Sequence, residues 1–271
     1  GWSAAFAVAW LVMLFALAAG LLSYRWLTET EPQHTEEAAA LSKEVARSSW
    51  PIAAMVGILA AGLLFTAVYE QTGQSLILWA RDCTRRSLLG YSFPASSLLG
   101  VPGLLVLGMQ PLLNRALSVL SRRSDKPSLL ARIGIGLLFG VVAYVIMIGA
   151  AVRQGRSQEL VGPWWLVACF VALTVGELLV YPLCMALVTR LAPPTASAAA
   201  MGLWMAAVAG GQWLAGEVAA HWSMWSHAVF FLVLAALALA AIVVLALAAR
   251  PIRRALADDD RAGQVCRTTT V

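Results

Sequence analysis

The stretch Pro163–Val188, PWWLVACFVALTVGELLVYPLCMALV, is long and apolar enough to cross a bilayer, and it carries one charged residue, Glu177, near its middle. A membrane span needs roughly 20 predominantly apolar residues. Glu177 lies about 14 residues, or roughly 21 Å, along the helix axis from Pro163. A charged side chain at that depth costs about 3 kcal/mol on insertion scales, so it normally faces a bundle interior or a water-filled cavity. The stretch therefore predicts a membrane-spanning helix with a candidate functional site at its centre.

The whole chain has the composition of an integral membrane protein. Of its 271 residues, 61% are hydrophobic and 12% are charged, whereas an average soluble domain has about 25% charged residues. Because lipid leaves no partner for an open strand edge, the long apolar runs are predicted to be helices. The runs that are long enough to span are residues 2–23, 50–70, 93–120, 129–152, 163–189, 198–220 and 226–249. We therefore predict an all-α integral membrane protein with seven spans.

Lys and Arg fall unevenly on the two sides of these spans. With the N-terminus outside, the inner connections hold thirteen Lys and Arg residues, and the outer connections hold five, Arg81, Arg85, Arg86, Arg153 and Arg156. The positive-inside rule then predicts an N-out, C-in orientation. The net charge of +5 is thus a topology signal. No basic stripe interleaved with aromatic residues indicates a nucleic-acid partner.

The segment from Tyr24 to Ser49 is the longest polar connection and is rich in Glu and Ala. It is interpreted as a cytoplasmic linker, residues 24–49, between one helix, residues 1–23, and a block of six helices, residues 50–249; a cytoplasmic tail, residues 250–271, follows. Six helices with both ends inside are the shape of half a major facilitator transporter. We predict the C-terminal six-helix half of a major facilitator fold plus one preceding transmembrane helix. Residues 1–23 are then expected to be the last helix of a missing N-terminal half.

Acidic residues within or at the edge of the spans are Glu70, Glu177 and Glu217. A carboxylate as deep as Glu177 binds a cation, takes up a proton or pairs with a buried base, and no Lys or Arg lies in the central part of any span. Glu70 begins a polar cluster, after which residues 76–80 are apolar again. This pattern suggests one helix that runs on past the cluster, with Glu70 as a gate or proton relay in its outer half; the alternative is an interfacial helix end. Glu217, near the outer end of its helix, is predicted to be solvated.

Trp204 lies deep in its predicted helix, where it either lines a cavity or packs against neighbouring helices. None of the three His residues has ligand spacing to another His, Cys or carboxylate, so we predict neither a metal site nor a cofactor. The four Cys residues have no paired spacing and are interpreted as structural. No nucleophile elbow, phosphate-binding loop or metalloprotease motif is present, so an enzyme is not expected.

The chain resembles the proton-dependent oligopeptide transporters, the peptide transporter family of the major facilitator superfamily, from its first residue to its last predicted helix. The strongest match runs from Gly176 through Pro182 to Pro193 and is similar to the family's tenth-helix pattern GELxxxPxxxxxxTKLAP. Three shorter matches resemble the eleventh, seventh and eighth helices: Met201-Gly202-Leu203-Trp204, Tyr69-Glu70-Gln71 and Phe93-Pro94-Ala95-Ser96.

This resemblance implies proton-coupled symport of di- and tripeptides by alternating access, with small peptides, protons and the lipid bilayer as partners. It places the peptide's terminal amine on Glu177, makes Trp204 and Tyr181 pocket residues, and implicates Glu70 in proton coupling near the outer gate. The basic residues that face the peptide carboxylate belong to the family's first half. This chain alone is therefore not expected to transport and needs the missing N-terminal half.

Several positions differ from the family pattern. Thr66 stands where the seventh helix usually has Trp, Pro102 where the eighth usually has Asn, and Tyr181 and Cys184 where smaller Ser and Gly are usual. These differences leave another small solute of a major facilitator transporter as an alternative substrate. A seven-helix receptor is a second alternative, although a retinal protein is excluded because Lys43 and Lys126 both lie in loops. The compact loops favour a bacterial inner membrane.

Overall fold

The computed structural model describes residues 10–22 except 12, 16 and 20, then residues 51–88, 91–92, 94–122, 128–193 and 196–269. The chain divides into two units, Gly1–Arg47 and Ser48–Val271. In the first unit the described residues are helical, as predicted for residues 2–23. The predicted linker, residues 24–49, lies outside the described residues.

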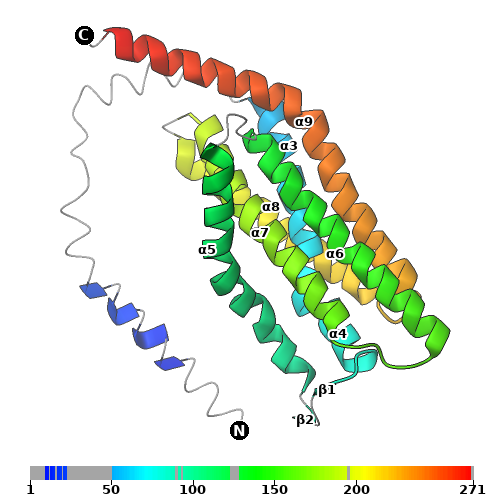
Figure 1. The fold of residues 1–271 in the computed structure, drawn as a ribbon. Helices are drawn as coiled ribbons and strands as arrows, with labels where there is room; N and C mark the ends of the chain where they lie inside the picture. The colour runs from blue at the N-terminus through cyan, green and yellow to red at the C-terminus, as the bar shows by residue number, and fades with distance from the viewer. Residues whose placement is uncertain are drawn as a thin grey trace. The chain divides into compact units, whose positions relative to one another are not determined.

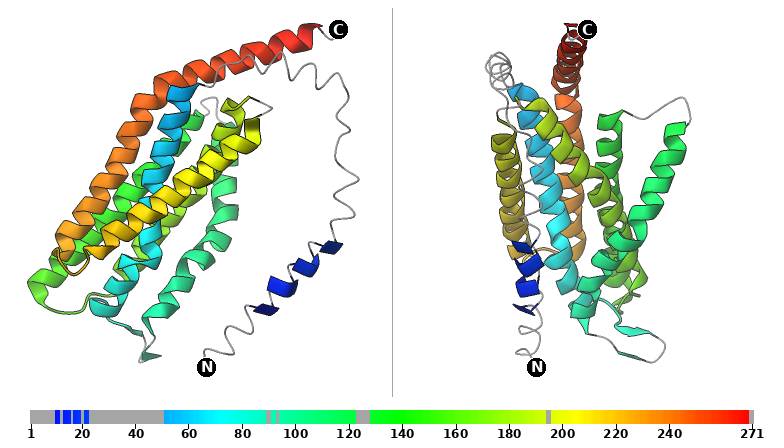
Figure 2. Two further views of the ribbon diagram at one scale, coloured as in Figure 1. Left: turned by 180° about the vertical axis from the view of Figure 1, so that it is seen from behind. Right: turned by 90° about the vertical axis from the view of Figure 1, so that its left-hand side faces the viewer.

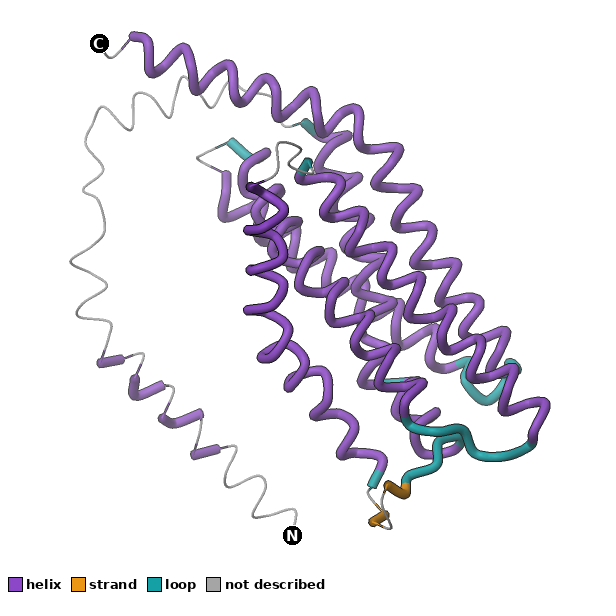
Figure 3. The backbone as a smooth tube through the Cα atoms, in the orientation of Figure 1, coloured by secondary structure: helices purple, strands orange, loops and turns teal. Residues whose placement is uncertain are grey.

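The second unit is built almost entirely of helices (Figures 1 and 3). Its elements are α3 (Ile52–Tyr69), the 3₁₀ turn η1 (Glu70–Gly73), α4 (Ser75–Asp82), β1 (Ser87–Leu88), β2 (Tyr91–Ser92), η2 (Ala95–Leu99), α5 (Gly100–Arg122), α6 (Leu129–Ser157), α7 (Trp164–Leu191), α8 (Ser197–Ala220) and α9 (His227–Thr269). Within the described residues, six helical segments are long and apolar enough to cross a membrane. They coincide with the last six of the seven predicted spans.

The first of these spans, Ile52–Asp82, runs on past the polar cluster as the sequence suggested, but it is not one uninterrupted helix. α3 ends at Tyr69, the 3₁₀ turn follows, and α4 begins at Ser75. The backbone at Gln74 leaves the helical region, with φ −117° and ψ −97°. Gly73 is a poor helix former, and the Gln71 side chain bonds to backbone and side-chain groups outside the regular ladder. The predicted single helix is thus wrong at this point.

The last span is followed by more helix than the sequence indicated. α9 continues to Thr269, although the segment apolar enough to cross a membrane ends at Ala257. Pro251 lies inside this helix. The predicted tail is therefore largely helical where the structure describes it, and its last part is coloured red in Figure 2.

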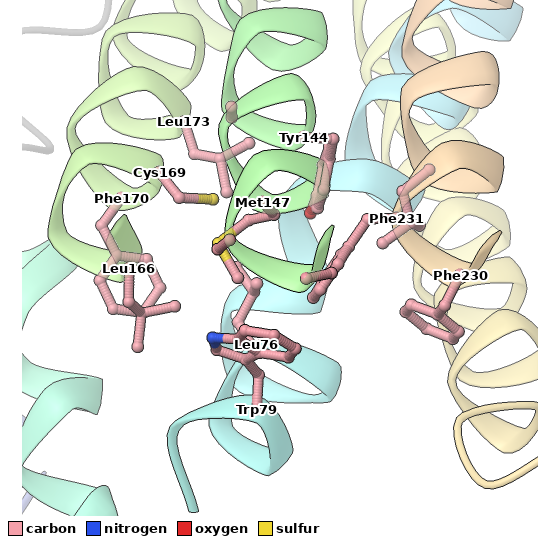
Figure 4. Close-up of a cluster of buried hydrophobic side chains, with 14 of the residues drawn as sticks. Leu76, Trp79, Tyr144, Met147, Leu166, Cys169, Phe170, Leu173, Phe230 and Phe231 are labelled. Atoms are coloured by element: carbon pink, nitrogen blue, oxygen red, sulfur yellow. The ribbon is translucent and has the colours of Figure 1, made fainter. Parts of the chain in front are cut away.

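Two apolar clusters hold the bundle together, one toward each end. α6 lies along α7 and α9, and α3 lies along α8 and α9. The first cluster joins α4, α6, α7 and α9 through Trp79, Tyr144, Phe170 and Phe231. In Figure 4 the rings of Trp79 and Tyr144 lie near Phe231, and Phe170 lies beside Leu166. Tyr144 also donates a hydrogen bond of 2.6 Å to the carbonyl of Val68. The second cluster joins the other ends of α3, α6, α7, α8 and α9.

Three of the cysteines, Cys83, Cys169 and Cys184, are buried and free. Cys83 lies just beyond the first span, where burial raises the pKa of its thiol to about 11. A thiol with so high a pKa stays protonated near neutral pH and is a poor nucleophile.

α5 and α8 present apolar side chains that the described residues of the second unit leave exposed. Leu104 and Leu107 of α5 are 71% and 75% exposed, and Trp213 of α8 is 68% exposed. Almost none of the apolar segment of α5 is buried. Exposed apolar faces on these two helices are as expected for surfaces that meet lipid or another part of a membrane assembly.

Close approach of α3 and α8 depends on Gly211. A Cβ atom built there would lie 2.5 Å from the Leu63 carbonyl oxygen and 2.6 Å from the Thr66 Cβ. Gly216, on the same helix, has open space at the corresponding position. Small residues at such contacts allow membrane helices to pack backbone against backbone.

We expect Gly211→Ala to destabilise the protein by about 1–3 kcal/mol, because the added methyl group meets backbone atoms that must move. Gly216→Ala is the matched control, expected to be neutral or stabilising by up to about 1 kcal/mol. Reversible unfolding in mixed detergent micelles measures both. Equal effects of the two substitutions would contradict this account of the α3–α8 contact.

Candidate functional site

Glu177 is bound by a tyrosine from a neighbouring helix. It lies halfway along α7, and Tyr69 is the last residue of α3. The Tyr69 hydroxyl donates a hydrogen bond of 2.6 Å to Oε2 of Glu177. This length is typical of an O–H donor on a charged oxygen. Both side chains are half-buried, so water or a ligand still reaches them.

Glu177 has no cationic partner in the part of the chain that the structure describes. The ion pair between Arg81 and Asp82 lies at the far end of α4, away from Glu177. A carboxylate at this depth that holds a single hydroxyl donor keeps hydrogen-bonding capacity for more donors. The geometry thus supplies an acceptor site for a positively charged or hydrogen-donating group.

A second hydroxyl pair lies one helical turn away on the same two helices. The hydroxyls of Tyr181 and Thr66 are 3.0 Å apart. Thr66 donates its own proton to the Gly62 carbonyl at 2.9 Å, and a threonine hydroxyl has only one proton to give. Tyr181 is therefore the donor to Thr66. Two positions that differ from the family pattern in the sequence thus contact each other directly.

Aromatic rings surround these polar groups. The Tyr181 ring meets the rings of Phe65, Tyr69 and Trp204 edge-on, with centroid distances of 5.9, 6.2 and 6.0 Å. Phe65 and Tyr69 stack at 6.2 Å. Edge-to-face contacts at these distances are favourable and orient the rings. Tyr181 is the central member of this group, which fixes the direction of its hydroxyl.

Trp204 belongs to this aromatic group but is only 1% exposed. The six-membered ring of Trp204 lies over Gly62. A Cβ atom added to Gly62 would be 2.5 Å from Cζ3 of Trp204. In this conformation the side chain packs α8 against α3 and presents almost no surface to a cavity. Its predicted role in lining a pocket remains a prediction.

Glu70 binds a different helix from its neighbour Tyr69. Its Oε1 accepts a hydrogen bond of 3.2 Å from Nε2 of Gln212 on α8. The structure therefore brings Glu177, Tyr181 and Trp204 into one group and places Glu70 on the adjacent α3–α8 contact. The third predicted carboxylate, Glu217, is exposed, as the sequence indicated.

Gln71 is a buried polar residue that sequence reasoning did not single out. Its Nε2 donates to the Ala215 carbonyl of α8 at 2.9 Å, and its Oε1 accepts from the Ser75 hydroxyl at 2.6 Å. The sequence feature that could have indicated this hydrogen bond is the spacing of Gln71 and Ser75. Residues four apart share a helix face. Tyr69, the partner of Glu177, likewise appeared in the sequence analysis only as part of the Tyr69-Glu70-Gln71 motif.

Neither a metal nor a cofactor has an evident place in this group. Among the described residues, no cluster of three or more His, Cys, Asp and Glu side chains is arranged to hold a metal ion. The group consists of one acceptor, hydroxyl donors and aromatic rings, which suits recognition of an organic molecule.

Comparisons with known proteins agree on one family. The sequence model described as the POT family matches residues 41–229. The peptide transporter YePEPT of Yersinia enterocolitica is 30% identical over 165 residues, which are 60% of this chain and 32% of that protein. The di-/tripeptide transporter of Lactococcus lactis subsp. cremoris is 24% identical, over 76% of this chain and 42% of that protein.

Solved structures share the fold. A crystal structure of a peptide transporter POT in complex with sulfate superposes with a TM-score of 0.67 at 21% identity, covering 93% of this chain and 53% of that one. The predicted fold class, an all-α membrane fold of the major facilitator type, is confirmed. The chain spans between a third and about half of the length of these relatives.

A double-mutant cycle tests the Tyr69–Glu177 bond. We expect Tyr69→Phe and Glu177→Ala to show a coupling of about 1 kcal/mol in unfolding free energy, because each removes the same hydrogen bond. Tyr144→Phe combined with Glu177→Ala is the control, since the Tyr144 hydroxyl donates to Val68 instead. That pair should be additive within about 0.5 kcal/mol. Additivity of the Tyr69 pair would show that the bond does not contribute.

Proposed function

Because the chain belongs to the POT family, we propose that it forms part of a secondary active transporter that carries di- and tripeptides together with protons. Several of its relatives are named as peptide transporters. The observation that carries the proposal is Glu177, a carboxylate at the middle of a membrane span, held by a tyrosine hydroxyl and free of any described cation.

The terminal ammonium of a short peptide is the partner that this carboxylate lacks. An ammonium group offers three donors and a positive charge, and a partly buried carboxylate binds it more strongly than an exposed one does. Tyr69 holds Glu177 in one orientation before the peptide arrives. Such preorganisation lowers the entropic cost of binding.

The aromatic group beside Glu177 supports a role in binding the peptide's side chains. Tyr181 stands next to the carboxylate on α7, with its ring against Phe65, Tyr69 and Trp204. Faces and edges of aromatic rings accept side chains of many shapes, as a transporter of varied peptides requires. We propose Tyr181 and Trp204 as pocket residues on this basis, with Trp204 exposed in another state of the cycle.

Glu70 is the proposed site of proton coupling. It begins the short turn that follows Tyr69, and its side-chain partner among the described residues is the neutral Gln212. Protonation of Glu70 changes the charge of that contact and so biases the α3–α8 arrangement. A shift between conformations requires this kind of differential interaction.

The position of the site supports alternating access. Tyr69 packs against both apolar clusters, so Glu177 lies where the two clusters meet. In transporters with two related halves, the substrate binds at the midplane and the halves rock about it. We propose that residues 50–249 form one such half, that residues 1–23 end the other, and that the other half contributes the rest of the pocket.

The membrane setting is proposed from charge and from the relatives. The excess of Lys and Arg in alternate connections supports an N-out, C-in orientation. The named relatives come from bacteria, which supports a bacterial inner membrane. The protein itself is an integral membrane protein.

One structural feature favours a second candidate substrate. Thr66 and Tyr181, which both differ from the family pattern, contact each other one helical turn from Glu177. A differently shaped pocket supports transport of another small amine-bearing solute. Competition of uptake by unlabelled dipeptides separates the two candidates, because only a peptide transporter is inhibited.

We expect Glu177→Gln in the complete protein to weaken dipeptide binding at least about 100-fold with little loss of folding, because the peptide ammonium loses its counter-charge. Isothermal titration of the purified protein measures the affinity. Glu217→Gln, an exposed carboxylate, is the control and should bind as the wild type does. N-acetylated dipeptides should compete poorly with the wild type. Retained dipeptide affinity in Glu177→Gln would overturn the assignment.

We expect Glu70→Gln to abolish peptide accumulation driven by a proton gradient while peptide exchange across the membrane continues. The reason is that the amide of the substituted residue can still bond to Gln212, but an amide takes up no proton near neutral pH. Uptake into proteoliposomes with and without an imposed gradient measures this. Glu159→Gln, an exposed residue in the α6–α7 connection, is the control. Normal gradient-driven uptake by Glu70→Gln would place coupling elsewhere.

A further inference from the structure

A cavity of about 530 Å³ opens at the end of the bundle that carries the hairpin β1–β2. Three connections meet there, as Figure 1 shows around the labels β1 and β2. The end of α4 and the following segment supply Arg81, Arg85 and Arg86, the segment before η2 supplies Pro94, and the α6–α7 connection supplies Leu160. None of these residues takes part in the site around Glu177.

The backbone that carries these arginines is held in place. The amide of Arg85 donates to the Val161 carbonyl at 2.8 Å, and the amide of Val161 donates to the Cys83 carbonyl at 3.0 Å. Cys83 and Val161 are buried, at 3% and 4% exposed. This parallel bridge fixes the segment that leads into the hairpin against the α6–α7 connection. The cavity is therefore bounded by positioned chain rather than by a free loop.

The cavity carries an excess of positive charge. Arg81 forms a two-point ion pair with Asp82, with distances of 2.7 and 3.1 Å. Arg85 and Arg86 are exposed, and neither has a carboxylate partner within the described residues. Outer connections of membrane proteins normally have few Lys and Arg. Three of the five predicted outer cations nevertheless converge on this one cavity.

The cavity also lies at the depth of lipid headgroups. The first span ends at Asp82, and the span of α7 begins at Trp164, which is 67% exposed. An exposed tryptophan at a helix end marks the interface between hydrocarbon and water. Leu160, on the cavity wall, is 49% exposed and gives the site an apolar side. Cations beside an apolar surface at this depth match a phosphate that is attached to an acyl chain.

We propose that this cavity binds a phosphate group, supplied by the headgroup of an anionic phospholipid, through the guanidinium groups of Arg85 and Arg86 with Arg81 beside them. Arginine suits this role because its planar fork pairs with two phosphate oxygens at once. A lipid bound here joins α4 to the α6–α7 connection and so stabilises this end of the bundle.

The test uses the complete protein, purified in a neutral detergent, and follows its thermal unfolding during titration with a short-chain phosphatidylglycerol. We expect saturable stabilisation of the wild type and at least about a tenfold weaker apparent affinity for the double substitution Arg85→Gln, Arg86→Gln. The control is Arg153→Gln, Arg156→Gln, which removes two exposed arginines from the same predicted side outside the cavity. The control should respond as the wild type does.

Parallel titrations identify the source of the phosphate. Short-chain phosphatidylcholine tests whether net negative charge is needed, and inorganic phosphate tests whether the acyl chain is needed. A response to phosphatidylglycerol alone supports a lipid site, and an equal response to inorganic phosphate supports a phosphate site filled from solution. No response of the wild type to either anion overturns the proposal. An equal response of the Arg85/Arg86 variant and the wild type also overturns it.

Discussion

The hydrogen bond from Tyr69 to Glu177 is the contact on which the rest of the site depends. A carboxylate halfway through a membrane span must find donors inside the protein, because lipid offers none. α7 cannot supply them from its own backbone, since its amides are used in the helix. The donor comes from α3, while α6 also lies against α7 at this depth, where Gly136 packs on Gly176. The aromatic contacts of Tyr181 and Phe65 then hold that arrangement.

Much of the fold follows from the sequence because the bilayer allows so few solutions. Long apolar runs must be helices, and six of them appear in the structure where they were predicted. The break between Tyr69 and Ser75 was harder to predict. It depends on Gln71 finding the Ala215 carbonyl on α8, 144 positions away. The helix propensities of neighbouring residues carry no information about such a distant contact. The sequence therefore indicated one helix where the structure has two.

The candidate site also has one part that the sequence predicts and one part that it does not. The depth of Glu177 is readable from its distance to the helix end, because an α-helix rises about 1.5 Å per residue. Its partner is not readable, since that depends on which helices are neighbours and how each is rotated. Trp204 is a second residue whose contacts cannot be predicted from the sequence. Its place within a helix is readable from the sequence, yet its ring is covered by the close approach at Gly62, which only the α3–α8 packing determines.

The end of α3 ties the two parts of the proposed mechanism together. Tyr69, the last residue of α3, reaches α7, while Glu70 and Gln71 on the turn that follows reach α8. A rotation or shift of this short segment cannot preserve all three contacts. In the proposed cycle, a peptide ammonium acts on the first contact and a proton on the second. Coupling between two ligands requires one element whose arrangement both of them bias. Glu70 and Gln71 lie on the 3₁₀ turn that directly follows Tyr69, so a movement of this turn is transmitted to the end of α3, where Tyr69 binds Glu177.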